Sequence, residues 1–281
     1  MFAQTLGSTT LGLNGMLITV EVDIADGLPS FDIVGLPDTA VRESRERVRA
    51  AIKNSGFKFP AKRITVNLAP ADLKKDSSGL DLPIAIGILA ACGHLTLSET
   101  KKSLFAGELS LDGKLRGISG ILPIAINCVE QSISEMFVAP DNTPEALLVG
   151  GLTIYSPSSL SQLIAHLRDA PMMAPAQKIE QTYRSTTTED FADVQGQAVA
   201  KRALEIAAAG GHNLIMIGPP GSGKTMLAQR IPSILPPMTD HESLDVTKIY
   251  SVAGLLDSTS GLITTRPFRN PHHTISAATM T

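Results

Sequence analysis

A glycine-rich loop stands between an apolar run and a helix-forming stretch in residues 213–229. The run Leu214–Ile217 has the length and composition of a buried strand. Residues 218–225, Gly-Pro-Pro-Gly-Ser-Gly-Lys-Thr, then fit the pattern G-x-x-x-x-G-K-[ST] at every fixed position. The stretch Met226–Arg230 favours a helix. Strand, loop and helix in this order are the context that a phosphate-binding loop requires, so we predict nucleotide binding.

Each residue type in this loop has a physical reason to be there. Glycines reach backbone conformations that other residues avoid, so that several N–H groups can converge on an anion. The helix N-terminus adds partial positive charge. Lys224 can reach the β- and γ-phosphates, and the Thr225 hydroxyl can bind Mg²⁺. We predict ATP and Mg²⁺ as cofactors; the loop residues that would hold them are Gly218, Pro219, Pro220, Gly221, Ser222, Gly223, Lys224 and Thr225. A glycine-rich turn that matches by chance is the alternative.

The composition is that of an ordinary globular protein. The 281 residues are 43% hydrophobic and 18% charged, and the net charge of −3 gives no chain-wide sign of nucleic-acid binding. Cys92 and Cys128 lie in apolar runs, which indicates core residues in a reducing compartment. The N-terminus lacks the basic start of a secretory signal, and the longest uncharged apolar run, Leu82–Cys92, is too short to span a bilayer. We therefore expect a cytoplasmic protein without a membrane partner.

The periodicity predicts two domains. An α+β domain is expected over residues 1–170, a linker over 171–188 and a second domain over 189–281. The strands predicted in the first domain are 16–22, 31–34, 63–68, 104–109, 114–118, 136–139 and 152–155. Its predicted helices are 39–55, 81–92, 122–130, 143–149 and 158–168. The second domain should contain helices at 198–209 and 244–256 besides the one after the loop.

A second acidic motif is missing after the phosphate loop. ATPases of this class hold Mg²⁺ with a further strand that ends in Asp, often Asp-Glu, and no such pattern follows Thr225. We interpret the sequence as part of a longer protein. Residues 1–281 are expected to bind ATP without turnover and to contain no catalytic residue.

Basic residues concentrate on the helix predicted at 39–55. The side chains that could contact DNA phosphates without reading base sequence are Arg42, Arg45, Arg49 and Lys53. Further basic residues are nearby in sequence: Lys58, Lys62, Arg63, Lys74 and Lys75. A solvated helix face with Glu–Arg pairs is the alternative. The pair His272-His273 is expected to be structural, because adjacent residues rarely bind one metal ion together.

Several motifs in combination resemble the magnesium-chelatase-like AAA+ ATPases of the YifB/ComM type. They are Phe191–Gln197, the loop 218–225, Ile249–Gly254, Arg266–Arg269 with Pro271–Ser276, and in the first domain Gly35–Asp38, Asn67–Asp72 and Asp81–Ile86. The resemblance covers essentially the whole chain. It implies a truncated α/β P-loop domain of the AAA+ class, whose Walker B, sensor and arginine-finger residues lie beyond Thr281.

The same resemblance carries expectations about function. It implies a homo-hexameric, ATP-driven ring and a DNA branch-migration helicase acting on single-stranded or branched DNA in natural transformation. It also implies that Val194 and Gly196 lie near the adenine; from the residues alone, this segment is only a polar turn before a helix.

The first domain is similar to the catalytic domain of Lon protease. Ser77–Gly79 is where Lon carries its nucleophile loop, and Gly107–Gly113 with Gly117–Ile121 resembles the strand pair that leads to Lon's catalytic lysine. That lysine position holds Leu122, and Lys114 lies on the other side of the Gly117–Gly120 turn. A serine without a base is a weak nucleophile. We therefore predict a scaffold or DNA-contacting domain that is not a peptidase.

Two other functions remain open from sequence. One is the motor subunit of a magnesium-chelatase-like metal-insertion complex, which the Lon-like domain argues against because the resemblance implies that such motors lack it. The other is a peptidase or protein-unfolding machine.

Overall fold

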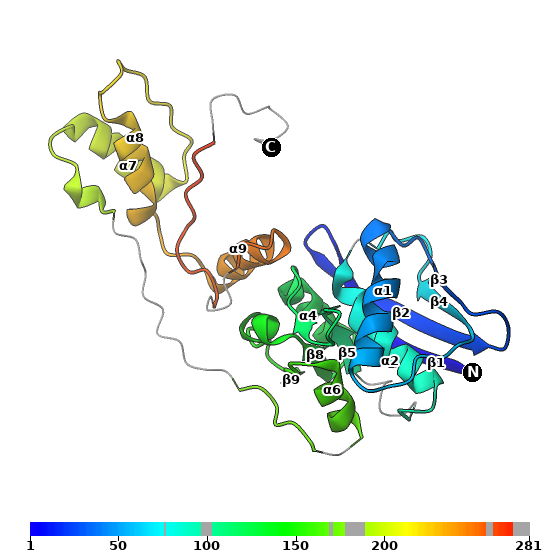
Figure 1. The fold of residues 1–281 in the computed structure, drawn as a ribbon. Helices are drawn as coiled ribbons and strands as arrows, with labels where there is room; N and C mark the ends of the chain where they lie inside the picture. The colour runs from blue at the N-terminus through cyan, green and yellow to red at the C-terminus, as the bar shows by residue number, and fades with distance from the viewer. Residues whose placement is uncertain (76, 97–102, 169–170, 178–188, 257–260, 272–281) are drawn as a thin grey trace. The chain divides into compact units, whose positions relative to one another are not determined.

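The computed structural model describes residues 1–281 except 76, 97–102, 169–170, 178–188, 257–260 and 272–281 (Figure 1). The chain forms two compact units. The first contains residues 1–181 and 247–261, and the second contains 182–246 and 262–281. The sequence-based division at 171–188 assigns residues 247–261 to the second domain, whereas in the structure they belong to the first unit.

A mixed sheet forms the centre of the first unit. Among the described residues it has seven strands in the order β3-β4-β2-β1-β5-β8-β9. Their bounds are β1 Phe2–Leu11, β2 Asn14–Ala25, β3 Ser30–Val34, β4 Arg63–Ala69, β5 Ser103–Ala106, β8 Glu135–Val138 and β9 Thr153–Tyr155. β2 is antiparallel to both of its neighbours, and all other neighbouring pairs are parallel. The sequence predicts an α+β domain here; the structure confirms a mixture of strands and helices, but four of the six neighbouring strand pairs are parallel, so the fold is a mixed α/β one. The likeness to Lon stays a prediction.

Helices cover both faces of this sheet. The bounds are α1 Thr39–Asn54, α2 Asp81–Ala91, α4 Ile121–Glu130, α5 Thr143–Ala146 and α6 Leu160–Leu167. One apolar core joins α1, α2 and α6 to Phe105 and Phe137, and a second joins α4 and α5 to Leu104 and Met136. Because successive strand residues face opposite sides, alternate residues of β5 and β8 belong to different cores.

Strand β1 is missing from the sequence-based assignment. Its sequence contains buried hydroxyl residues, which obscure the alternation expected of a strand. The folded chain satisfies two of these hydroxyls: Thr5 Oγ1 donates to the Pro83 carbonyl at 2.9 Å, and Ser8 Oγ donates to the Met16 carbonyl at 2.8 Å. Both acceptors come from other elements, so the sequence of β1 itself does not show that these hydroxyls can be buried in a strand.

The predicted strand 104–109 is split at Gly107. Its first part is β5, and its second part, β6 (Glu108–Leu109), pairs with β7 (Leu115–Arg116) in a separate two-stranded sheet. The Gly107 carbonyl accepts a hydrogen bond from the Leu82 N–H at 3.2 Å, which ties the break to α2. The strand predicted at 114–118 is present in a shorter form as β7.

The second unit is helical where the structure describes it. Its elements are η3 Phe191–Asp193, α7 Ala198–Gly210, α8 Lys224–Arg230 and η4 Ile231–Ser233, and α9, Asp240–Val252, begins in it and ends in the first unit. The prediction of a strand at Leu214–Ile217 is wrong for this structure. The segment forms no ladder with any described strand, and Ile215 and Ile217 are 84% and 90% exposed. A strand requires a partner, and the described part of this unit offers none.

Two further expectations concern cysteines and membranes. Cys92 and Cys128 are both free thiols, as expected of core residues. Within the described ranges, every helix is too short or too polar to span a bilayer.

Candidate functional site

The phosphate loop closes on its own lysine. Gly221 and Gly223 have φ values of +80° and +82°, and these left-handed conformations turn the backbone into α8. The Lys224 ammonium lies 2.8 Å from the carbonyl oxygens of Gly218 and Pro219 and 3.1 Å from Ser222 Oγ. The cation is therefore held inside the curve of the loop, where it would meet an anion.

Thr225 follows in the first turn of α8. Its side chain is exposed, and its hydroxyl makes no hydrogen bond to any described residue. A free hydroxyl next to a loop lysine suits the role of a Mg²⁺ ligand predicted for it. The loop residues thus fit the predicted cofactors in chemistry and in placement.

The predicted adenine segment is next to this loop. Gln197, which precedes α7, donates from Nε2 to the Ser222 carbonyl at 2.9 Å. Val194 is buried and its carbonyl accepts from Lys201 Nζ at 2.9 Å, whereas Gly196 is exposed. The fold brings residues 194–197 and 218–225 together, as a nucleotide site requires; contact of Val194 and Gly196 with a base stays a prediction.

A small apolar core supports these two segments. Phe191, Val194, Leu204 and Leu227 form it. The N-terminus of η3 has a reciprocal capping box, because Asp190 Oδ1 accepts from the Ala192 N–H at 2.9 Å and Asp193 Oδ2 accepts from the Asp190 N–H at 3.2 Å. This capping box belongs to η3, whereas Gln197 at the start of α7 makes no side-chain cap.

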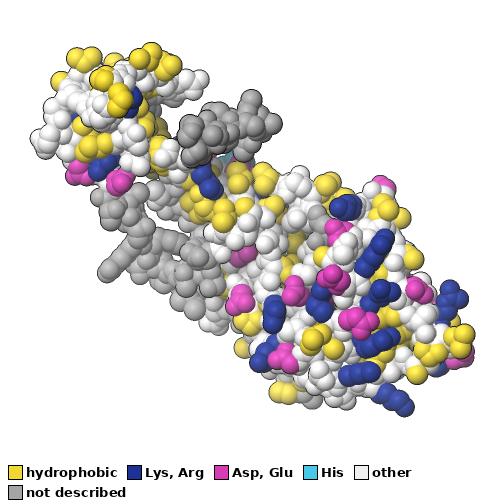
Figure 2. Space-filling view, turned by 45° about the horizontal axis from the view of Figure 1, so that its top comes forward, with side chains coloured by type: hydrophobic (Ala, Val, Ile, Leu, Met, Phe, Trp, Pro, Cys, Tyr) yellow, Lys and Arg dark blue, Asp and Glu magenta, His cyan; other side chains and the backbone are white. Residues whose placement is uncertain are grey.

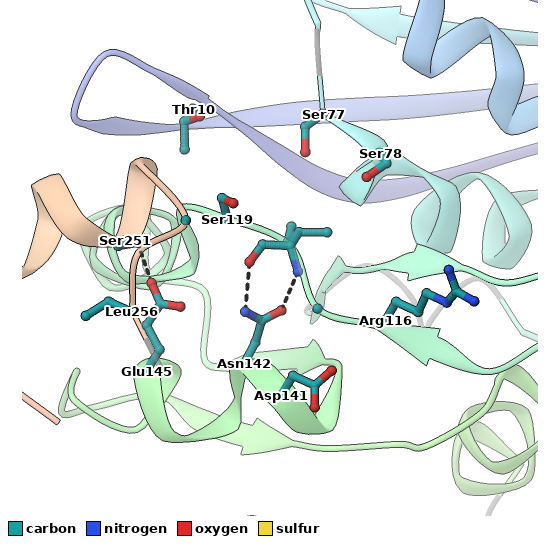
Figure 3. A pocket seen from close by; sticks show the side chains of 13 residues that line it. Thr10, Ser77, Ser78, Arg116, Ser119, Asp141, Asn142, Glu145, Ser251 and Leu256 are labelled. Atoms are coloured by element: carbon teal, nitrogen blue, oxygen red, sulfur yellow. Dashed lines mark hydrogen bonds between the residues drawn. The ribbon is translucent and has the colours of Figure 1, made fainter. Parts of the chain in front are cut away.

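The first unit contains a polar cavity of about 790 Å³ (Figure 3). Ser77 and Ser78 line it together with Thr10 of β1 and the end of α9 at Ser251. Ser77 Oγ accepts the Gly79 N–H at 3.1 Å and so caps the short helix η1, Ser78–Leu80. The serine loop thus lies in a cavity, and its likeness to a nucleophile loop stays a prediction.

No lysine or histidine is among the described residues that line this serine cavity. Leu122, which is predicted to stand at the position of Lon's lysine, is fully buried in α4, and its backbone N–H donates to Glu145 Oε1 at 2.8 Å. Lys114 instead lies 3.3 Å from Asp112 at the hairpin turn. The geometry supplies a hydroxyl without the ammonium that would activate it.

Two side chains hold the remaining wall of the serine cavity (Figure 3). Asn142 bonds both backbone groups of Ile118 at 2.8 Å. Glu145 Oε1 also accepts from Ser251 Oγ, and the Ser251 carbonyl accepts the Gly120 N–H at 3.0 Å. Burial raises the pKa of the Glu145 carboxyl, against the lowering effect of these hydrogen bonds. The motif Ile249–Gly254, which sequence reasoning could only match to a family, thus closes part of this cavity.

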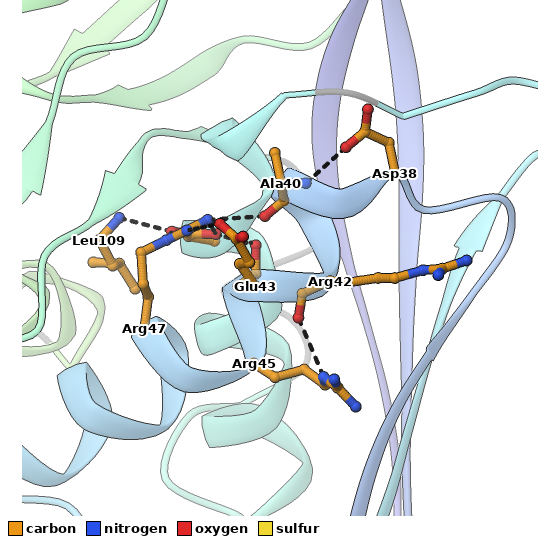
Figure 4. A network of polar contacts seen from close by, with 9 residues as sticks. Asp38, Ala40, Arg42, Glu43, Arg45, Arg47 and Leu109 are labelled. Atoms are coloured by element: carbon orange, nitrogen blue, oxygen red, sulfur yellow. Dashed lines mark hydrogen bonds and ion pairs between the residues drawn. The ribbon is translucent and has the colours of Figure 1, made fainter.

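The basic residues of the first unit have different environments. Figure 2 shows Lys and Arg intermixed with Asp and Glu over the end that carries α1, β3 and β4. Arg47 Nε lies 2.6 Å from Asp81 Oδ2, and the same buried carboxylate accepts from Ser44 and from the Leu109 N–H (Figure 4). The hydrogen bond to Asp81 raises the pKa of Arg47. This arginine joins α1 to α2 and is not available to a ligand.

Three lysines that sequence placed near the basic helix are also engaged. Lys75 is fully buried and donates to the carbonyls of Gly35, at 2.9 Å, and Pro70; burial lowers its pKa. Lys62 pairs with Asp26 at 2.8 Å, and Lys74 with Asp38 at 3.6 Å. Their proximity in sequence to the helix therefore did not make them part of one basic surface.

The four predicted DNA contacts do not form one cluster either. The Arg49 guanidinium lies over the Phe59 ring, 5.4 Å from its centroid, and Lys53 is in the last turn of α1. Arg42 and Arg45 line a groove with Arg63 of β4. His272 and His273 lie outside the described residues, and the described ranges contain no group of three or more His, Cys, Asp or Glu placed to hold a metal ion.

Comparison with known families gives matches over both units. Residues 20–142 match a family described as subunit ChlI of Mg-chelatase, and residues 190–281 match one described as magnesium chelatase, subunit ChlI. The phosphate loop lies within the second match.

Curated relatives match along almost the whole chain. A protein named competence protein ComM from Haemophilus influenzae is 44% identical over 273 residues, which are 95% of this chain and 53% of that protein. Uncharacterized proteins named YifB from Escherichia coli and Salmonella typhimurium are 44% and 45% identical over 96% of the chain and 53% of their own length. The chain thus spans about half the length of the curated relatives it matches.

Proposed function

The chain belongs to the magnesium-chelatase-like ChlI family that includes ComM and YifB, and from this premise we propose that it supplies the ATP-binding loop of a DNA-remodelling motor. Family membership supports a motor of the AAA+ type. The observation that carries the nucleotide part is the enclosure of the Lys224 ammonium by the loop carbonyls of Gly218 and Pro219.

Nucleotide binding would exchange the partners of this lysine. Lys224 would leave the carbonyls for the phosphates, and the backbone N–H groups of Gly221–Lys224 would converge on the same oxygens. Mg²⁺, bound through Thr225, would neutralise phosphate charge. Gln197 donates a hydrogen bond to the Ser222 carbonyl at 2.9 Å, so a shift of the loop would move Gln197 and the start of α7.

The DNA part of the proposal rests on the family and on one printed name. The Haemophilus influenzae relative is named a competence protein. A branch-migration helicase working as a homo-hexameric ring in the cytoplasm is the function proposed for a protein that carries both units. The Lon-like first unit would act as a scaffold or DNA-contacting part.

The second candidate function is the motor subunit of a metal-insertion complex, and it is supported by the descriptions of the matched families. Both matched families are described by a magnesium-chelatase subunit, and one of them covers residues 20–142. The first unit therefore does not by itself separate the two functions. An experiment with branched DNA does.

The test uses the chain and a protein of the relatives' length that contains it. Calorimetry should detect binding of ATP with Mg²⁺ by both, and phosphate release should be seen with the longer protein and not with residues 1–281. The longer protein should resolve four-way DNA in an ATP-dependent manner. Hydrolysis without any effect on branched DNA would overturn the DNA proposal and favour the metal-insertion motor.

A further inference from the structure

A groove of about 570 Å³ runs along the open edge of the main sheet in the first unit. Arg42 and Arg45 reach it from α1, Arg63 and Thr65 from β4, and Asp32 from the edge strand β3. Figure 4 shows the side chains of Arg42 and Arg45 extending from the side of α1 away from Arg47. We call these five residues the arginine groove.

Two of the three guanidinium groups have no protein partner. The side chains of Arg42 and Arg63 make no hydrogen bond or ion pair with any described residue, and both are exposed. Arg45 Nη1 donates to the Phe31 carbonyl on β3 at 3.4 Å, which fixes that guanidinium beside the strand edge. The other arginines of α1 are engaged, Arg47 with Asp81 and Arg49 with the Phe59 ring. The groove therefore contains two guanidinium groups without a partner among the described residues and a third that is bonded to the neighbouring strand.

The charge balance of the groove is cationic. Its lining has three arginines and one carboxylate, Asp32. Like charges held together are unfavourable unless an anion screens them. Guanidinium groups match phosphate oxygens in a fork geometry, and the Thr65 hydroxyl can donate a further hydrogen bond. The chemistry points to a phosphate-bearing ligand.

We propose that the arginine groove binds the phosphodiester backbone of a nucleic-acid strand, an inference that rests on the proposed function and locates its DNA contact. The groove lining includes no aromatic side chain on which a base could stack. Binding is therefore to the backbone and is independent of base sequence.

An acidic peptide is the competing occupant of a strand edge. A peptide that adds to β3 needs the outward backbone groups of that strand. Arg45 already bonds the Phe31 carbonyl at this edge. Arg45 thus occupies a carbonyl group to which an added peptide strand would have to bond. This favours a ligand that contacts only the guanidinium groups.

The test measures binding of the chain to a fluorescent single-stranded oligonucleotide of thymidines by anisotropy between about 50 and 200 mM salt, where phosphate contacts dominate the salt dependence. Arg42→Ala, Arg45→Ala and Arg63→Ala should each lower the salt slope by about 0.7 unit, the value for one phosphate contact on a single strand, so that each variant loses about 2.6-fold less affinity over this range than the parent. Asp32→Asn should increase affinity, an effect that misfolding cannot produce.

Two lysines provide matched controls. Lys58→Ala removes one exposed charge outside the groove and should leave the slope unchanged. Lys53 lies on α1, 11 residues and therefore about 16 Å along the axis from Arg42. Lys53→Ala should also be neutral; an effect equal to that of Arg42→Ala would mean that the whole helix face binds and would overturn the groove.

Competition identifies the ligand class. Unlabelled oligonucleotides of different sequence should displace the probe equally, whereas polyglutamate and inorganic phosphate at equal phosphate or carboxylate concentration should be far weaker. Stronger competition by polyglutamate would overturn the proposal in favour of a peptide. Unchanged DNA binding in the triple arginine variant would overturn the proposal that the arginine groove binds DNA, but it would not contradict the proposed DNA-remodelling motor. If the arginine variants weaken DNA binding as expected but the longer protein does not resolve branched DNA, only the proposed motor function is overturned.

Discussion

The phosphate loop and the serine cavity are both built from recognisable motifs, but they depend on the fold to very different degrees. The loop is eight consecutive residues, and Lys224 contacts only residues within six positions of itself. The serine cavity takes Thr10 from β1, Ser77 from the loop before η1, Glu145 from α5 and Ser251 from α9. The residues that line the serine cavity are therefore brought together only by the folding of four separate elements. The contacts of the loop lysine are set by one stretch of sequence, whereas the composition of the cavity depends on how distant segments pack.

The largest effect is expected from Asp81→Ala, which should lower the unfolding free energy of the first unit without changing nucleotide binding. Asp81→Ala leaves Arg47 partly buried without its carboxylate and removes the acceptor for Ser44 and the Leu109 N–H. Breaking a buried pair in this way should cost about 3–5 kcal/mol of unfolding free energy, measured by urea denaturation. ATP affinity at low temperature should be unchanged. Glu46→Ala, an exposed change on α1, is the control; a parallel loss of ATP binding in Asp81→Ala would remove the contrast between the two regions.

Lys224→Ala should have the converse effect. Loss of a charge-assisted contact to phosphate is expected to weaken ATP binding about 100-fold, or about 2.7 kcal/mol, by calorimetry. Because Lys224 bonds only its own loop, the urea midpoint of the first unit should not move. Arg202→Ala, an exposed change in α7, should alter neither quantity. ATP affinity in Lys224→Ala equal to that of the parent would show that the loop is a turn without a ligand.

The serine cavity should give the protein a pH dependence that the loop lacks. Burial raises the pKa of Glu145 above its ordinary value of 4.5, so the folded state binds this proton more tightly than the unfolded state. The contribution of Glu145 to the unfolding free energy is complete below pH 4.5, and it is lost as the pH rises through the pKa that Glu145 has in the folded protein. Urea titrations from pH 4 to 8 should show that the free energy of unfolding falls as the pH rises, and Glu145→Gln should remove the part of this fall that Glu145 contributes. Burial also raises the pKa of Asp81, which therefore contributes with the same sign and remains in the variant. An opposite slope would mean that the hydrogen bonds from Ser251 and Leu122 outweigh burial.

The smallest effect is expected at the two serines. Ser77→Ala removes the cap on the Gly79 N–H and should cost about 1 kcal/mol. Ser78→Ala should cost less, because its hydroxyl bonds no described residue. Neither variant should change peptide hydrolysis, which should be absent from the parent in an assay with casein and ATP. Casein cleavage that disappears in either variant would show that the cavity is a peptidase site despite Leu122.

Local signals predicted several elements correctly. A helix is predicted at 39–55, and α1 spans Thr39–Asn54, with Val41, Val48 and Ile52 buried and Asp38 accepting the Ala40 N–H at 2.7 Å. The prediction succeeded because an amphipathic helix and its cap lie within one stretch of chain. The strand expected at Leu214–Ile217 failed for the opposite reason, since pairing is a property of two segments.

The order of an apolar run, a glycine loop and a helix was readable from the sequence alone, as was the chemistry of Lys224 and Thr225, because contiguous residues are constrained by their own covalent geometry. Only the tertiary structure decided what the other charges do. Lys75 became a buried donor to Gly35, Arg47 an ion pair with Asp81, and Arg42 an unpaired cation beside Arg63. In sequence these residues belong to one basic region. Whether a cation is desolvated, paired or left to solvent depends on which distant segments pack around it, and no pattern within the region carries that information.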